Sequence, residues 1–125
     1  MTSARFRPYH RITSPADFRR AYERRQSSAD ALLIVYGVEN QLEHARLGIS
    51  VSRKRVRSAV ARNRIKRVLR EAFRLSQAEL PTGIDLVVVP RGPRPLTYAD
   101  ARGSLPRLAQ AVARRLNLRA EKPAT

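Results

Sequence analysis

Basic side chains along one face of a single helix are the strongest chemical signal in this sequence. Residues 61–76 read ARNRIKRVLREAFRLS. On a helical wheel of about 100° per residue, the apolar residues of this stretch share one arc. The opposite face carries these polar and basic residues: Asn63, Arg67, Arg70 and Arg74. One face can therefore pack on a sheet while the other meets phosphate groups.

The charge on this segment is hardly compensated. Residues 53–74 hold ten basic residues and one acid, Glu71, which we expect to pair with Arg67. Like-charge neighbours four residues apart on a helix cost about 0.2–0.5 kcal/mol each, and an ordinary solvated face mixes both signs. A solvated face remains the alternative, but the pattern favours binding to nucleic acid.

The composition of the whole chain points the same way. The 125 residues include 26 Lys and Arg against 10 Asp and Glu, giving a net charge of +16. Such an imbalance repels itself, so a polyanionic partner is the simplest account of it. Lys occurs only at positions 54, 66 and 122, and the other basic residues are Arg, whose planar fork suits phosphate.

Several classes of function are disfavoured. The chain has no Cys, which excludes disulfides and thiolate metal sites. Its apolar runs at 31–38 and 84–89 have the length of strands and cannot span a bilayer, and the N-terminus lacks the apolar core of a signal peptide. We therefore expect a cytoplasmic protein with no membrane partner; a basic membrane-surface protein is the open alternative.

Catalytic chemistry by the chain itself is not indicated. His10 lies near the N-terminus and His44 in a polar turn, and neither sits in a metal-binding or acid–base pattern. The acids show no paired-carboxylate motif, and there is no glycine-rich phosphate loop. We expect no catalytic residue and no metal ligand in this chain.

The basic helix needs neighbours to position it, and two further helices are predicted. The first covers residues 14–25, starting at a Ser-Pro pair with Asp17 reaching back to the cap. The last begins at Thr97, with Asp100 completing a second capping signature, and Pro106 is expected to kink or split it.

Strands are predicted at 31–38, 45–52 and 84–89. The order is then α-β-β-α-β-α, with one or two further short strands allowed. Residues 1–13 are expected to form a basic arm and 118–125 a frayed tail. The whole chain, 1–125, is predicted to be a single RNA-binding domain.

The second predicted strand, ARLGISVS at 45–52, alternates cleanly. Its apolar residues define a core face, and the other face is small, polar and basic: Arg46, Gly48, Ser50 and Ser52. We expect this second face to be open to a ligand. Phe18, Tyr22 and Tyr36 could then stack on unpaired bases, which is how single strands are held without sequence preference.

Several segments resemble the bacterial ribonuclease P protein subunit. The specific core is S-V-S-R-K at 50–54, V-R-S-A-V-A-R-N-R-I-K-R at 56–67 and L-R-E-A-F-R at 69–74. Outer segments are also similar: D-F-R-R-A-Y at 17–22, E-L-P-T-G-I-D-L-V-V-V-P-R at 79–91 and P-L-T-Y-A-D at 95–100. The resemblance covers about residues 10–117. It departs at Arg57-Ser58, where many members have Gly-Asn, and Arg55 looks like an extra residue in the loop.

The resemblance implies a fold and a partner. The fold is α+β, an α/β sandwich of ribosomal-protein-like type with a small, mainly antiparallel sheet, and the basic helix joins neighbouring parallel strands in a left-handed crossover, against the usual hand. The partner is a catalytic RNA that removes the 5′ leader of precursor tRNA, using Mg²⁺ held mainly by the RNA and substrate. One protein per RNA is expected.

The resemblance also implies two sets of binding residues. Those facing the catalytic RNA are Arg62, Asn63, Arg64, Lys66, Arg67 and Arg70. Those lining a cleft for the single-stranded leader are Phe18, Tyr22, Tyr36, Ser50, Ser52, Arg53, Lys54 and Arg91.

Two other RNA- or DNA-binding hypotheses compete with this one. A ribosomal or RNA-assembly protein of similar fold would bind structured RNA without an enzymatic role, and it would not distinguish precursor from mature tRNA. A nucleoid DNA-binding protein is less favoured, because no groove-reading motif is present.

Overall fold

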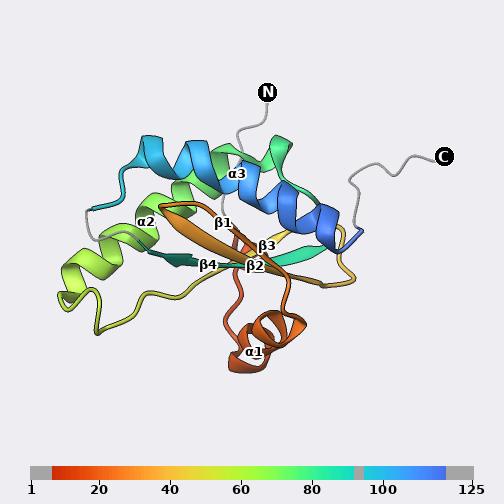
Figure 1. Cartoon of the computed structure of the whole chain (residues 1–125), viewed down its shortest axis with the longest axis horizontal. Coiled ribbons are helices and arrows are strands. Elements are labelled where there is room, and N and C mark those ends of the chain that lie inside the picture. The colour runs from red at the N-terminus through yellow and green to blue at the C-terminus, as the bar shows by residue number, and fades with distance from the viewer. Residues whose placement is uncertain (1–6, 92–94, 118–125) are drawn as a thin grey trace.

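A computed structural model describes residues 7–91 and 95–117, which form three α-helices and a four-stranded sheet (Figure 1). The helices are α1 (Pro15–Arg24), α2 (Ala59–Leu75) and α3 (Tyr98–Arg115). The strands are β1 (Ser27–Ala29), β2 (Leu33–Glu39), β3 (Arg46–Ile49) and β4 (Ile84–Pro90). Two short 3-10 helices, η1 (Pro8–His10) and η2 (Gln77–Glu79), complete the elements.

The sheet has the strand order β1-β2-β4-β3, and it is mainly antiparallel as predicted. Only β3 and β4 run parallel, and α2 joins these two neighbours. The additional short strand allowed by the sequence is β1, which precedes the first predicted strand. The left hand of the crossover stays a prediction from the resemblance.

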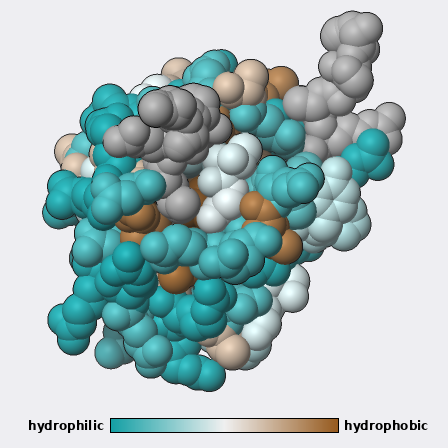
Figure 2. Space-filling model, turned by 90° about the vertical axis from the view of Figure 1, so that its right-hand side faces the viewer, coloured by the Kyte–Doolittle hydropathy of each residue, from teal (hydrophilic) through white to brown (hydrophobic). Residues whose placement is uncertain are grey.

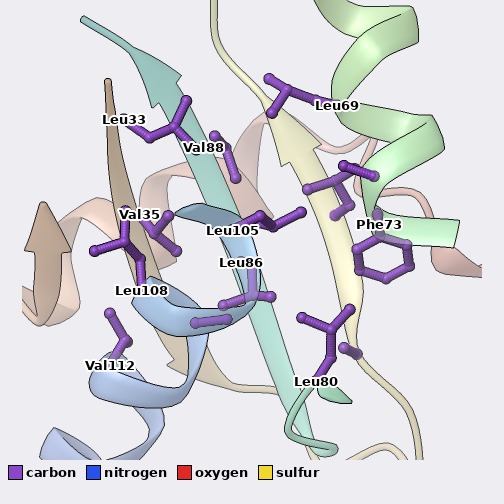
Figure 3. Close-up of a cluster of buried hydrophobic side chains, with 14 of the residues drawn as sticks. Leu33, Val35, Leu69, Phe73, Leu80, Leu86, Val88, Leu105, Leu108 and Val112 are labelled. Atoms are coloured by element: carbon purple, nitrogen blue, oxygen red, sulfur yellow. The ribbon is translucent and has the colours of Figure 1, made fainter. Parts of the chain in front are cut away.

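Helices α2 and α3 cover one face of the sheet, and α1 lies on the other (Figure 1). The larger core lies under α2 and α3, and Leu69 and Phe73 of α2 belong to the same buried cluster as Leu86 and Val88 of β4 (Figure 3). These residues recur at helical spacing on α2 and at every second position on β4, which is why both elements turn an apolar side inward. The core thus fixes the apolar side of α2 and leaves its arginine side outward.

The face that was predicted to be open is partly covered. Phe18 of α1 packs in a smaller cluster with Ile12, Val38 and Val87. A Cβ on Gly48 would lie 2.8 Å from the Phe18 ring and 3.2 Å from Ile12, so glycine lets α1 approach β3 this closely. The face that was expected to be open to a ligand is therefore covered by α1 at Gly48.

The predicted helix starts are confirmed, with one change. Ser14 accepts a hydrogen bond from the backbone of Ala16, and Thr97 and Asp100 form a reciprocal capping box. Asp17 does not cap α1, because its carboxylate binds Arg20 and Arg46. Helix α3 is continuous through Pro106, so of the two predicted effects of this proline the split is wrong, and the kink stays a prediction.

The predicted basic arm is also wrong for the part that the structure describes. Residues 8–10 form η1, Arg11 bridges to Leu47 of β3, and Ile12 is buried. This segment lies against the sheet because the apolar side chain of Ile12 belongs to the small cluster under α1. The rest of the predicted arm and the predicted tail, 118–125, lie outside the described residues.

Candidate nucleic-acid interface

The outer face of α2 carries cations without acidic partners. Ser58 caps the helix by accepting from the backbone of Ala61 at 3.1 Å, so the basic face begins at a fixed point. Within residues 7–91 and 95–117, Arg64, Lys66 and Arg67 form no ion pair. This face can therefore offer several cations to a polyanion.

Glu71 pairs with Arg74. The predicted pairing of Glu71 with Arg67 is therefore wrong. The pair lies in the last turns of α2, away from the cap. Arg70 is half-buried, and burial followed by the charge of Arg11 lowers the pKa of its guanidinium. A phosphate placed there would meet two arginines from different elements.

Arg62 has a structural task as well as a predicted binding role. Its guanidinium donates to the backbone carbonyls of Val56 and Arg57, both at 2.9 Å. These bonds fold the preceding loop back onto the first turns of α2. The cations of that loop are thus held beside those of the helix.

The loop itself is a compact turn. The Ser52 hydroxyl accepts from the backbone N–H groups of Lys54 (3.1 Å) and Arg55 (3.3 Å). Arg55 donates to the carbonyl of Arg91 at 2.9 Å, which ties the loop to the end of β4. The side chains of Arg53 and Lys54 are exposed. Three residues of the predicted leader set, Ser52, Lys54 and Arg91, therefore lie in one neighbourhood.

Two of the predicted aromatic residues meet on the sheet face that α1 covers. The rings of Tyr22 and Tyr36 make an edge-to-face contact with centroids 4.9 Å apart. They line a pocket of about 370 Å³ with Glu23, Arg25 and Ser27. Tyr22 is 37% exposed, so part of its ring is available for stacking. Phe18, by contrast, lies mostly in the small cluster against Gly48.

A larger pocket, of about 710 Å³, joins the two predicted residue sets. Ser52 and Arg91 of the leader set and Arg64 of the RNA-binding set all line it. Its other walls include Ile34, Val56 and Val89, which no sequence signal marked as functional, and Arg55, which belongs to the basic stretch 53–74 but to neither predicted residue set. Their placement depends on how β2, β4 and the loop converge, which local patterning does not reveal.

Two further predicted residues lie outside this pocket. Ser50 follows β3 and donates its backbone N–H to the carbonyl of Val88, and Asn63 is exposed on α2.

Five acids among the described residues form ion pairs away from α2. The ion pairs away from α2 are Asp17 with Arg20 and Arg46, Asp30 with Arg107, Glu39 with Arg24, Glu79 with Arg102, and Asp85 with Arg46. In each of them an arginine outside the predicted RNA-binding set takes the acid. The positive charge on α2 and its loop is therefore left for an external partner.

The two histidines lie together, which sequence distance did not suggest. The ring centroids of His10 and His44 are 5.6 Å apart, and Tyr9 contacts both rings. In the part of the chain that is described, no group of three or more His, Cys, Asp or Glu side chains could hold a metal ion. Over the same residues, no helix is long and apolar enough to cross a membrane.

Comparison with known proteins identifies the family. The family model described as Ribonuclease P matches residues 6–115. The chain is similar to the ribonuclease P protein component of Methylococcus capsulatus, with 52% identity over 67% of this chain, and to that of Coxiella burnetii, with 44% identity over 63%. These matches span 65% and 64% of the two relatives, slightly under two thirds of their lengths.

A solved structure shows the same arrangement of elements. The ribonuclease P protein of Staphylococcus aureus superposes with a TM-score of 0.70 at 36% identity, covering 82% of this chain and 94% of that one. Sequence and fold thus agree over nearly all the described residues. The chain belongs to the ribonuclease P protein family.

Proposed function

We propose that this chain is the protein subunit of a ribonuclease P ribonucleoprotein, which removes the 5′ leader from precursor tRNA in the cytoplasm. One observation carries the proposal: a single pocket is lined by Arg64 of the uncompensated α2 face and by Ser52 and Arg91 of the predicted leader set, and the rings of Tyr22 and Tyr36 meet on the sheet face that α1 covers. Family membership supports the same reading.

The two surfaces suit two kinds of RNA. The outer face of α2 would contact the phosphates of the structured catalytic RNA. Its residues are the cations Arg62, Arg64, Lys66, Arg67 and Arg70, together with Asn63. Arginine is well matched to this task, because its planar fork can hold two phosphate oxygens at once. Binding through phosphates gives affinity and register without reading sequence.

The α1 face suits a single strand. Tyr22 and Tyr36 offer stacking surface for an unpaired base, which is worth about 1–3 kcal/mol per base. At the far end of the face, Arg53, Lys54 and Arg91 would neutralise the leader phosphates. Ser50 and Ser52 lie in the chain between the end of β3 and Arg53. A leader laid along this face would bind by stacking and charge together.

Hydrolysis is assigned to the RNA partner. The Mg²⁺ ions, which would activate water and stabilise charge at the scissile phosphate, are proposed to be held mainly by the RNA and substrate. The chain's own contribution is to bind and orient. We propose one protein per RNA.

Reconstitution tests the function. The protein, added to its cognate RNA at low Mg²⁺, should increase cleavage of precursor tRNA and should bind precursor more tightly than mature tRNA. Lack of any stimulation would exclude the ribonuclease P role. If the protein binds RNA without increasing cleavage, and binds precursor and mature tRNA equally, the result would point instead to a ribosomal or RNA-assembly protein.

A further inference from the structure

A buried ion pair lies on the sheet face that α1 covers. Asp85 of β4 is fully buried. Its carboxylate accepts from Arg46 through Nε at 2.8 Å and Nη2 at 2.6 Å, and from the side chain of Asn40 at 2.9 Å. A buried carboxylate is tolerated only when it is paired and hydrogen-bonded. The guanidinium of Arg46 is therefore held in one position, and its bond to Asp85 raises its pKa.

The same guanidinium reaches α1. Nη2 of Arg46 lies 3.3 Å from Oδ2 of Asp17, in the first turn of that helix. The two side chains are 21% and 27% exposed, so solvent screens this pair less than an open surface pair. A fixed charge on the sheet thus holds the start of α1.

A second attachment holds the end of the helix. Arg20 donates to the backbone carbonyl of Glu39 at 2.9 Å, and Arg24 binds the Glu39 carboxylate through two bonds of 3.1 Å. The apolar contact of α1 comes from Ala21, which is buried, and Phe18, which is partly buried in the small cluster. Polar links at the start and the end of α1 act together with this contact to set the angle at which α1 lies on the sheet.

That angle places the aromatic rings. Phe18 directly follows Asp17 and packs against Gly48, while Tyr22, on the next turn, contacts Tyr36. Arg46 starts β3, whereas the predicted leader-binding Ser50 and Ser52 follow the other end of that strand. Arg46 can thus affect the rings without touching the leader.

We propose that the Asp17–Arg46–Asp85 network is a positioning device for the leader-binding face. Arg46 and Asp17 set where α1 holds Phe18 and Tyr22 over the sheet. The inference rests on the proposed function, because it assigns these residues an effect on leader recognition. Neither residue contacts the RNA.

The sharpest variant is Asp17→Ala, which removes the link from Arg46 to the start of α1 and leaves both partners of the buried Arg46–Asp85 pair in place. It also removes one negative charge, and charge alone would tighten RNA binding. Positioning predicts the opposite sign for the leader. The matched control is Glu43→Ala, the same charge change at an exposed turn residue outside the network. The conservative variant Asp17→Glu keeps the carboxylate and should retain most of the wild-type preference for precursor tRNA.

The measurement is the affinity of the reconstituted holoenzyme for precursor relative to mature tRNA. Asp17→Ala should lower this ratio roughly fivefold or more, the scale of one stacked base, with mature tRNA affinity and the salt slope of binding unchanged. Glu43→Ala should leave the ratio as in the wild type. A ratio equal in the two alanine variants would overturn the proposal. If Asp17→Ala lowers the melting temperature markedly, the isosteric Asp17→Asn carries the same test.

A second readout does not involve RNA. Nuclear Overhauser effects between the Tyr22 and Tyr36 rings should weaken in Asp17→Ala and persist in Glu43→Ala. Effects of unchanged strength in Asp17→Ala would overturn the positioning role, whatever the RNA does. The two proposals can fail separately. If the wild-type holoenzyme binds precursor and mature tRNA equally, the proposed function is overturned. If the Overhauser effects still weaken in Asp17→Ala in that case, the network positions α1 but has no role in leader recognition.

Discussion

Arg67 and Arg74 lie on the same helix, two turns apart, but only Arg74 has a carboxylate partner among the described residues. If the outer face of α2 binds phosphates, Arg67→Ala should reduce the slope of log affinity against log salt by about one unit, the value for one phosphate contact removed. Arg74→Ala should change the slope less, because Glu71 already competes for that charge. Filter binding to the catalytic RNA over a salt series measures both. Equal slopes in wild type and Arg67→Ala would show that the face is only solvated.

His10 gives a pH-dependent prediction. Burial, aided by His44 and Arg7, lowers its pKa below the ordinary 6.5, and its Nδ1 accepts from the backbone of Arg7 at 2.9 Å. The unfolded chain then binds the proton more readily, so the stability contributed by neutral His10 is present above pH 6.5 and lost as the pH falls below it.

The free energy of unfolding should therefore drop between pH 7.5 and 5.5 in the wild type, and drop less in His10→Asn. Asparagine keeps an acceptor near the Nδ1 position but does not titrate. Urea unfolding at the two pH values measures the difference. The carboxylates with lowered pKa values, such as Glu39, titrate below this window and do not confuse it. An identical drop in both proteins would contradict the assignment to His10.

At this scale the sequence predicted residue types better than residue partners. The two-faced pattern of α2 follows from spacing alone, and its outward cations lie where the wheel put them. The partner of Glu71 was predicted wrongly, because three- and four-residue spacings are both compatible with pairing on a helix. The contact between His10 and His44 joins segments far apart in the chain, and no local pattern encodes it.

Among the elements, α3 offers a test of helix propensity. Gly103 lies on its exposed side, and a Cβ added there would meet nothing within 4 Å. Gly103→Ala should raise the free energy of unfolding by about 0.5–1 kcal/mol, because alanine loses less backbone entropy in a helix than glycine. Chemical denaturation measures this.

Gly37→Ala is the matched control for that prediction. A Cβ at Gly37 would overlap the Val112 side chain of α3, so the same substitution should destabilise the protein by about 1–3 kcal/mol. Glycines on β2 and α3 thus have opposite expected effects. A loss of stability in Gly103→Ala would mean that this side of α3 is not free.

The elements themselves were predictable where their patterns are long. Helix α2 was expected at 61–76 and spans 59–75, and the cap at Thr97 is where its motif placed it. Strand β1 has three residues, Ser-Ser-Ala, too few to show a period, and it forms by pairing with β2. The closing of α1 over Gly48 depends on a tertiary contact, which explains why the face was expected to be open.

Over the whole molecule, the net positive charge opposes the folded state. The net charge is +16, and of the six acids that form ion pairs among the described residues, five do so away from α2. The side of the surface seen in Figure 2 is largely hydrophilic with small separate apolar patches, so no broad hydrophobic face is apparent there. Repulsion among the uncompensated cations should make the isolated protein marginally stable at low salt.

Anions should relieve this repulsion by binding the folded basic faces in preference to the unfolded chain. Sulfate or phosphate should therefore raise the urea midpoint and the helical circular dichroism more than chloride at matched ionic strength. The excess over chloride should shrink in the double variant Arg67→Ala, Arg70→Ala, which removes two cations from α2. A control variant, Arg114→Ala on α3, changes the charge at an exposed position outside the predicted RNA-binding set and should keep most of the excess. If sulfate and chloride act alike, screening alone explains the stabilisation, and the basic face of α2 has no preference for multivalent anions.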